Sequence, residues 1–212
     1  MQKAMKAMYD KAGPRVVKAL EARHFDACYC STAQEAAARV LELIPAGALV
    51  SWGGSMTVDA LGVKDELRRR GQPMLDRETV NTREEREAIM RQALSCDVYL
   101  MGSNAVTEDG QLFNIDGNGN RVAALCFGPR RVIVVAGMNK VVPDLAAAYA
   151  RVRHLAAPAN AQRFEIATPC AVNGQCGDCK SPQSICASMV ATRLCRPDGR
   201  ISVVLVGEDL GF

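Results

Sequence analysis

Five of the nine cysteines in this 212-residue chain lie close together near its C-terminus. Successive members are separated by five, two, six and eight residues, and they are Cys170, Cys176, Cys179, Cys186 and Cys195. The two-residue gap between Cys176 and Cys179 lets both thiolates reach one ion from a tight turn. The flanking thiols of Cys170 and Cys186 complete a set of four. Residues 168–196 therefore predict a metal or cluster site, with Cys195 left over.

Two kinds of metal centre suit four thiolates: a structural zinc ion and a [4Fe–4S] cluster. The spacing matches neither common ferredoxin pattern, and both histidines, His24 and His154, lie outside the segment. Cys176 and Cys179 could instead form a redox pair, although such pairs usually follow a strand and open a helix. Buried structural thiols explain scattered cysteines better than a cluster of five. The spacing alone leaves zinc and iron–sulfur open.

The composition is that of a globular protein. Hydrophobic residues make up 49% of the chain and charged residues 23%. The net charge of +3 and the few aromatic residues argue against a nucleic-acid partner. No apolar run has the length of a membrane span, and the N-terminus shows no signal peptide. We therefore expect a cytoplasmic protein, whose thiols stay reduced and serve metal or redox chemistry.

A second group of residues suits a small anionic ligand. Gly53, Gly54 and Ser55 form a loop between an expected strand and an expected helix, where backbone N–H groups can face an anion. An ordinary strand–helix turn explains this loop equally well. The polar segment 102–121 and the end of a later strand could supply further contacts, which are Asn104, Asn118, Asn120, Arg121 and Lys140. We expect the loop and the polar segment to face each other across one pocket.

Glu108 is the candidate catalytic residue. It stands in a turn beyond the expected strand 96–103. Asp109 beside it is explained by the preference of Asp-Gly pairs for hairpin turns, whereas the turn does not demand Glu108. Ligands of α/β proteins bind beyond the carboxyl ends of strands. Glu108 could therefore act there as a general base or nucleophile.

The elements that must position these residues alternate along the chain. Expected strands cover 25–30, 47–52, 96–103, 130–137 and 200–207, and turn signals within 108–127 predict short antiparallel hairpin strands. Expected helices cover 32–43, 57–70, 82–94 and 143–155. This alternation predicts a single α/β domain of residues 1–212 with a mostly parallel, doubly wound sheet. The cysteine-rich segment is an appendage between the last helix and the last strand.

Several stretches resemble the lactate-utilisation (LUD) domain family. They are "SWGGSMT" from residue 51, "GSNAVTEDGQLFNIDGNGNRVAAL" from residue 102 and "GMNKVVPDL" from residue 137. The tail "TPCAVNGQCGDCKSPQSICASM" resembles a cysteine-containing, LutC-like branch of that family. The resemblance covers nearly the whole chain from about residue 3. It implies a fold similar to sugar-phosphate isomerases and CoA-transferases (NagB/RpiA/CoA-transferase-like), and it assigns no catalytic residue.

The resemblance also implies a part in the oxidation of L-lactate to pyruvate with iron–sulfur partner proteins. Two functions are therefore expected. In the first, the protein is a subunit or accessory of an iron–sulfur oxidoreductase system, and the four cysteines bind a [4Fe–4S] cluster. In the second, it is an enzyme acting on a small anionic substrate, such as a sugar phosphate or an acyl-CoA, and the cysteines bind a structural zinc ion.

Overall fold

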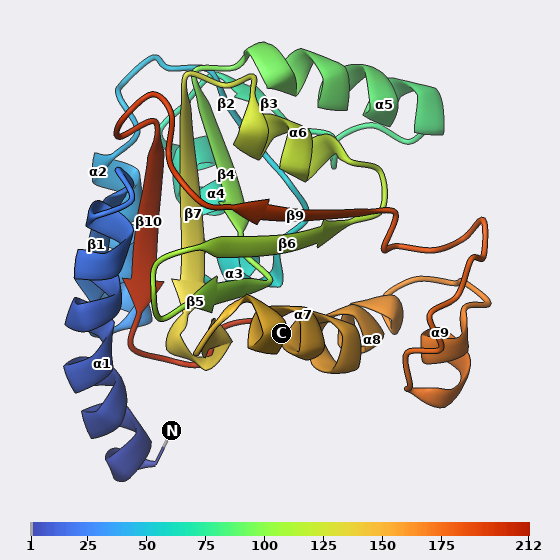
Figure 1. Ribbon diagram of the computed structural model, residues 1–212. Helices are drawn as coiled ribbons and strands as arrows, with labels where there is room; N and C mark the ends of the chain where they lie inside the picture. Colours follow the sequence, from blue (N-terminus) through green and yellow to red (C-terminus); the bar gives the residue numbers. More distant parts are fainter. Residues whose placement is uncertain (1) are drawn as a thin grey trace.

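Strands and helices alternate along the chain, and six of the strands form one parallel sheet (Figure 1). A computed structural model describes residues 2–212. In the order in which they pair, the strands are β1 (Asp26–Cys30), β10 (Ile201–Val206), β7 (Arg131–Gly137), β4 (Val98–Gly102), β2 (Val50–Trp52) and β3 (Met74–Leu75). Every pairing is parallel, so all carboxyl ends lie along one edge. The prediction of a mostly parallel α/β sheet is confirmed.

Strand β7 shows that this sheet is buried on both faces, as parallel sheets are. Val132 and Val134 belong to one apolar cluster, whereas Ile133 and Val135 belong to another. Helices α1 (Lys3–Glu21) and α6 (Asn120–Cys126) pack into the first cluster, and α2 (Ala33–Glu42), α3 (Met56–Ala60) and α4 (Val63–Arg69) pack into the second. The core therefore consists of two apolar layers separated by the sheet.

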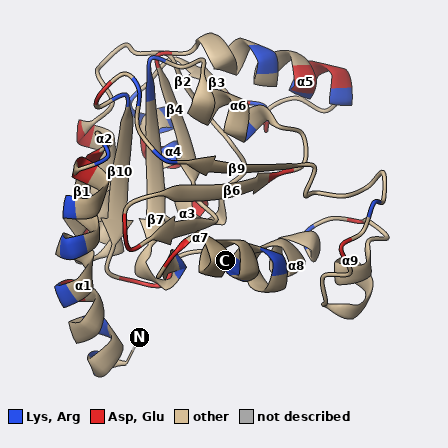
Figure 2. Cartoon of the chain, in the orientation of Figure 1, with Lys and Arg blue, Asp and Glu red and all other residues tan. Residues whose placement is uncertain are grey.

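Helix α5 (Arg83–Gln92) contributes no buried residue. Arg83 donates to Glu87 at 2.8 Å, and both basic and acidic residues lie along the helix (Figure 2). A complete capping box of Thr82 and Glu85 begins it, as the sequence predicts. None of the helices within residues 2–212 is both long and apolar enough to cross a membrane.

A second, smaller sheet lies across the carboxyl edge of the first. Its strands pair in the order β8 (Val141–Val142), β5 (Ala105–Thr107), β6 (Leu112–Asp116) and β9 (Ser188–Thr192). Strands β5 and β6 form an antiparallel hairpin, and β9 runs antiparallel to β6. Since β9 belongs to the cysteine-rich segment, pairing with β6 ties this segment to the body of the protein.

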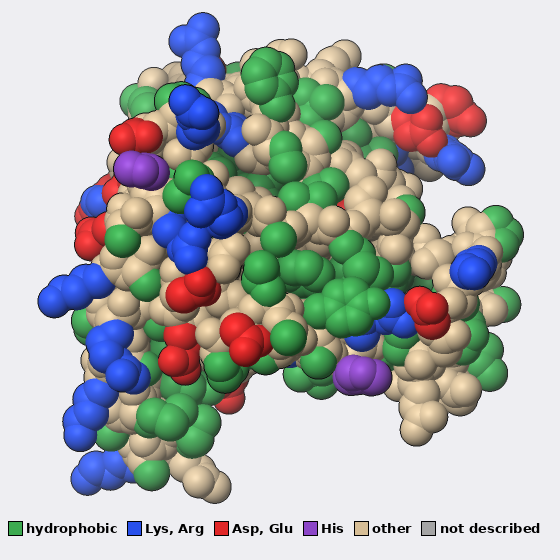
Figure 3. Space-filling model, in the orientation of Figure 1, with side chains coloured by type: hydrophobic (Ala, Val, Ile, Leu, Met, Phe, Trp, Pro, Cys, Tyr) green, Lys and Arg blue, Asp and Glu red, His purple; other side chains and the backbone are tan. Residues whose placement is uncertain are grey.

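One continuous helical segment covers the second sheet. Helix α7 (Leu145–Arg151) passes through a π-helical turn at 152–156 into α8 (Ala157–Ala161). Ala148, Val152 and Ala156 on this segment pack against Phe113 and Ile115 of β6. A short helix, α9 (Pro169–Asn173), follows and opens the cysteine-rich lobe, which projects from the body in Figure 3.

The chain departs from the predicted elements in two places. The helix expected over 57–70 divides into α3 and α4, because Gly62 takes a left-handed conformation with φ of 66°. The hairpin strands predicted within 108–127 do not extend beyond residue 116, since residues 120–126 form α6. The Asp116 carboxylate accepts the N–H groups of Gly119 and Arg121 and so turns the chain into this helix.

Substitution of two glycines tests whether the β5–β6 turn packs closely on α1. Gly110 and Gly47 both have positive φ, of 87° and 76°, so alanine costs about 1–2 kcal/mol of backbone strain at either position. A Cβ at 110 would lie 2.5 Å from the carbonyl of Ala19, whereas one at 47 meets nothing within 4 Å. We expect Gly110→Ala to lower the free energy of unfolding by about 1–3 kcal/mol more than Gly47→Ala does, measured in urea. Equal losses of unfolding free energy in the two variants would contradict close packing of the turn on α1.

Candidate functional site

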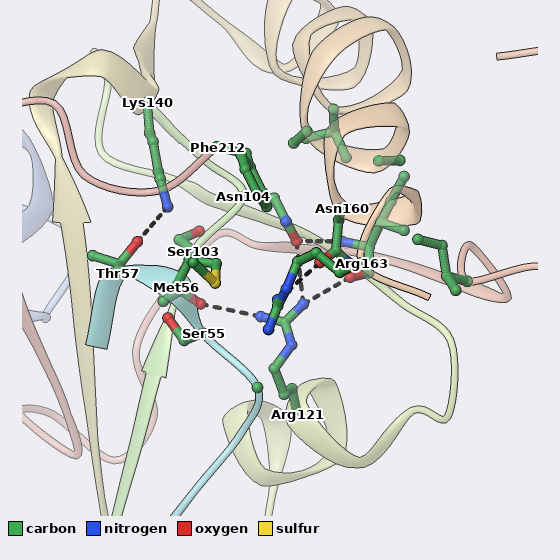
Figure 4. A pocket seen from close by; sticks show the side chains of 17 residues that line it. Ser55, Met56, Thr57, Ser103, Asn104, Arg121, Lys140, Asn160, Arg163 and Phe212 are labelled. Atoms are coloured by element: carbon green, nitrogen blue, oxygen red, sulfur yellow. Dashed lines mark hydrogen bonds between the residues drawn. The ribbon is translucent and has the colours of Figure 1, made fainter. Parts of the chain in front are cut away.

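A pocket opens beyond the carboxyl ends of the parallel strands, where α/β proteins bind ligands. It holds about 590 Å³ of empty space, and we call it the basic pocket (Figure 4). Its walls come from the segments that follow β2 and β4, from α6, from the end of β7, and from the α7–α8 segment. The lining residues are Gly54, Ser55, Met56, Thr57, Gly102, Ser103, Asn104, Ile115, Arg121, Lys140, Val152, Ala156, Ala157, Asn160, Arg163, Ile185 and Phe212.

The chemistry of these walls suits a small organic anion. Arg121, Lys140 and Arg163 are basic, and no acidic side chain belongs to the lining that the described residues form. Val152 and Ile185 add an apolar surface on the side of the α7–α8 segment. A ligand with a negative group and a short apolar part is therefore complementary to the pocket.

The glycine loop and the polar segment do meet at this pocket. Ser55 is buried, and its hydroxyl accepts the N–H of Val58 at 3.3 Å as the N-cap of α3. Gly54 lines the pocket, whereas Gly53 lies beneath it. A Cβ at Gly53 would come within 2.4 Å of the Arg121 side chain, so this position needs glycine for close approach. The loop thus packs directly on Arg121.

The guanidinium of Arg121 forms hydrogen bonds that connect the segments around the pocket. Nη1 donates to the carbonyl of Gly102 at 3.1 Å, and Nη2 donates to the carbonyl of Ile115 at 2.7 Å and to Oδ1 of Asn104 at 3.2 Å. Its Nε lies 3.5 Å from Asp116. The guanidinium therefore joins the ends of β4 and β6, and its charge is shared with protein acceptors.

Three other predicted site residues lie outside the lining of the basic pocket. Asn118 is exposed, and Asn120 donates to the hydroxyl of Tyr99 at 3.4 Å. Glu108 is exposed in the β5–β6 turn, where its N–H donates to the carbonyl of Val142 at 2.8 Å. The turn around Glu108 faces α1 instead of the pocket. We therefore assign Glu108 no catalytic role.

Lys140 is the most unusual group in the pocket. It is 4% exposed, and Nζ donates to Oγ1 of Thr57 at 2.7 Å. Burial, followed by the positive charges of Arg151 and Arg121, lowers its pKa to about 7. Its amine is therefore partly neutral at neutral pH.

The four predicted metal ligands share a second pocket, which we call the cysteine pocket. Cys170, Cys176, Cys179 and Cys186 all line it, around about 460 Å³ of empty space. Cys195 is fully buried elsewhere, in the core beside α1. In the described chain, no three His, Cys, Asp or Glu side chains are arranged as ligands of a single metal ion. The thiols thus surround a space and do not meet at a point.

Arg153 of the π-helical turn completes the cysteine pocket. Its Nε donates to Sγ of Cys176 at 3.0 Å, Nη2 lies 2.9 Å from Asp178, and Nη1 donates to the hydroxyl of Tyr149 at 2.9 Å. Burial, together with the neighbouring thiols, raises the pKa of Cys186 to about 11. If a metal centre were bound by these cysteines, Nε of Arg153 would donate a hydrogen bond to its Cys176 ligand.

The two pockets adjoin. Ala157 and Ile185 line both of them, so one wall separates a small basic cavity from four thiols. Sequence reasoning missed Arg153, Arg163 and Ile185. None of them stands in a motif, because only the folding of the α7–α8 segment and the cysteine-rich loop brings them to the pockets.

The protein thus combines a parallel α/β sheet, a basic pocket at the carboxyl edge of that sheet, and four thiols beside the pocket. The chain belongs to the LUD domain family, whose model matches residues 13–206. It is similar in fold to the crystal structure of a DUF162 family protein from Deinococcus radiodurans, with a TM-score of 0.55 and 13% identity over 93% of this chain and 98% of that one.

A ribose 5-phosphate isomerase from Plasmodium falciparum shows a partial likeness, with a TM-score of 0.32 and 15% identity over 51% of each chain. No curated protein sequence matches the chain. The likeness to the DUF162 structure shows the fold, and the residues of the two pockets must carry any statement about function.

The structural role of Arg121 can be separated from that of Arg163. Arg121→Met would leave the carbonyl oxygens of Gly102 and Ile115 without this donor, at about 1–3 kcal/mol for each group left unpaired. We expect the free energy of unfolding to fall by about 3 kcal/mol. Arg163 is exposed, so Arg163→Met should change stability by less than about 0.5 kcal/mol. Chemical denaturation measures both, and a neutral Arg121→Met would refute the anchoring role.

Proposed function

We propose that the protein is a component of an iron–sulfur oxidoreductase system that oxidises lactate or a similar small hydroxycarboxylate. In this proposal Cys170, Cys176, Cys179 and Cys186 bind a [4Fe–4S] cluster, and the basic pocket binds the carboxylate. The observation that carries the proposal is that four thiols line one pocket, which shares a wall with a basic cavity. Membership of the LUD domain family is consistent with lactate utilisation.

The spacing of the thiols favours a cluster over a single ion. Zinc binds each thiolate at about 2.3 Å, which would hold the four sulfurs within about 4 Å of one another. Within the described residues the four thiols line one pocket, but no three of them are arranged as ligands of a single ion. The all-cysteine donor set also fits a cubane cluster. When bound, such a cluster supplies one-electron transfer next to the basic pocket.

The position of the cysteine pocket suits exchange of electrons with a partner. Cys176 and Cys179 are only partly buried, and the side chain of Asp178 between them is 81% exposed. The lobe that carries these residues projects from the body of the protein (Figure 3). A centre held there would lie near the surface, within reach of another iron–sulfur subunit.

A second candidate function is an enzyme acting on a small anionic substrate, with a structural zinc ion in the cysteine pocket. The buried amine of Lys140 favours it, because a lysine with a lowered pKa is a recurrent catalytic group. Metal analysis of protein purified without oxygen separates the two functions. Iron and acid-labile sulfide with a brown colour support the first, and one zinc per chain supports the second.

Single substitutions test the ligand set. Serine at position 170, 176, 179 or 186 should each reduce bound iron by half or more after anaerobic reconstitution, because each removes one thiolate. Cys126→Ser is the matched control, since Cys126 is exposed on α6 and outside the cysteine pocket. Cys195→Ser should also retain iron. Iron and sulfide content and the visible absorption spectrum report the outcome, and loss of iron from Cys195→Ser alone would contradict the proposed set.

The bond from Arg153 to Cys176 predicts an effect on the reduction potential. A positive N–H donor at a ligating sulfur stabilises the reduced, more negative cluster. Arg153→Met should therefore lower the midpoint potential while the iron content stays unchanged, measured by redox titration followed by electron paramagnetic resonance. Arg163→Met, which removes an arginine that lines only the basic pocket, should leave the potential close to that of the wild type. A raised potential in Arg153→Met would rule out this role.

A further inference from the structure

We propose that Lys140 is an amine nucleophile that forms an imine with the oxo group of a 2-oxo carboxylate in the basic pocket. This inference deepens the proposed function, because it rests on the anion pocket and names a class of ligand. It does not depend on the identity of the centre in the cysteine pocket.

The hydrogen bonds around Lys140 leave its nitrogen free to react. Nζ donates to Oγ1 of Thr57 at 2.7 Å, and the Thr57 hydroxyl donates its own proton to the carbonyl of Leu210 at 3.2 Å. Thr57 therefore accepts from the amine and cannot at the same time protonate it. The bond fixes the direction of the side chain inside the pocket (Figure 4).

The other buried lysine provides the contrast. Lys64 is 7% exposed, and Nζ lies 2.7 Å from a carboxylate oxygen of Asp59 and 2.7 Å from one of Glu78. Those carboxylates hold Lys64 as an ammonium ion. Lys140 forms no ion pair within the described residues, and the charges that lower its pKa are the cations of Arg151 and Arg121.

A buried amine beside cations is the environment that makes a lysine nucleophilic. Desolvation and the positive neighbours lower the pKa of Lys140 to about 7, so a substantial share of the amine carries a free lone pair at neutral pH. The same cations attract the carboxylate of a ligand. The pocket therefore provides a nucleophile and an anion-binding surface in one space of small volume.

The step itself needs no oxidant. The nitrogen lone pair of Lys140 attacks the carbonyl carbon, and the carbon–oxygen double bond opens to a carbinolamine. The two amine hydrogens then leave with the former carbonyl oxygen as one water molecule, and a carbon–nitrogen double bond forms. Protonation of the imine draws electrons from the carbons beside it, which is how amine catalysis activates a carbonyl compound.

A 2-oxo carboxylate is the class that the walls of the pocket favour. Arg163 stands on the exposed rim, and within the described residues its guanidinium donates only to Oδ1 of Asn160, at 3.1 Å, so it can receive a carboxylate. Val152 and Ile185 offer apolar contact for a short alkyl group. A 2-hydroxy carboxylate such as lactate binds the same charges but has no carbonyl carbon for Lys140 to attack.

Reductive trapping tests the inference. The full chain is incubated with pyruvate and cyanoborohydride, and the adduct is located by peptide mass spectrometry. We expect one stable adduct on Lys140, none when lactate replaces pyruvate, and a rate at least tenfold lower with acetone, a methyl ketone that lacks the carboxylate. Thr57→Val should slow trapping, because the amine loses the acceptor that orients it. Lys64→Met is the matched control and should be trapped at Lys140 as the wild type is.

The outcomes separate this inference from the proposed cluster. The Cys176→Ser variant should still be trapped at Lys140 and at no other lysine, whatever metal it retains. Folded wild-type protein without an adduct on Lys140, or with adducts spread evenly over exposed lysines, would overturn the inference. The test rests on locating the adduct in the wild-type protein, so it stays decisive even if the variant Lys140→Met fails to fold. Lys140→Arg is a second, charge-retaining variant that should not be trapped.

Discussion

The candidate site depends on one partly buried guanidinium. Arg121 reaches from α6 to the carbonyl of Gly102 at the end of β4 and to that of Ile115 in β6. It thereby fixes the second sheet against the carboxyl edge of the first, and the basic pocket is the space left between them. The same contact explains why residue 53 is glycine, because the Arg121 side chain occupies the space that a Cβ would need there. An isolated guanidinium would be costly to bury, and its five donors explain why arginine can serve here.

The cations around the pocket are accommodated in different ways. Arg121 and Arg151 donate to protein oxygens, with Arg151 reaching the carbonyl of Asn104 at 2.7 Å. Within the part of the chain that the structure describes, the amine of Lys140 donates to one hydroxyl, and its pKa is lowered. Burial of an ammonium ion without a carboxylate is unfavourable, so the environment of Lys140 favours the neutral amine more than water does.

The sequence was sufficient for positions that follow strands directly. Ser55, Asn104 and Lys140 reach the pocket because the carboxyl ends of parallel strands share one edge, which strand prediction alone establishes. Glu108 was misplaced because β4 ends at Gly102, and the chain continues into β5 of the other sheet before the turn. The cysteines could be grouped by spacing, and the structure places the four in one pocket. The position of Arg153 beside these cysteines could not be predicted, because Arg153 lies in a π-helical turn outside the cysteine-rich segment.

The cysteine-rich loop and the basic pocket are mechanically joined. Ile185 stands between Ser184 and Cys186, which line the cysteine pocket, yet it also lines the basic pocket. The loop after β6 presses on it, since a Cβ at Gly117 would lie 3.1 Å from Cα of Ile185. Binding of a centre by Cys186 would therefore fix one wall of the basic pocket. Coupling between two sites is reciprocal, so an anion that orders this wall must strengthen the hold of the thiols on their centre by the same factor.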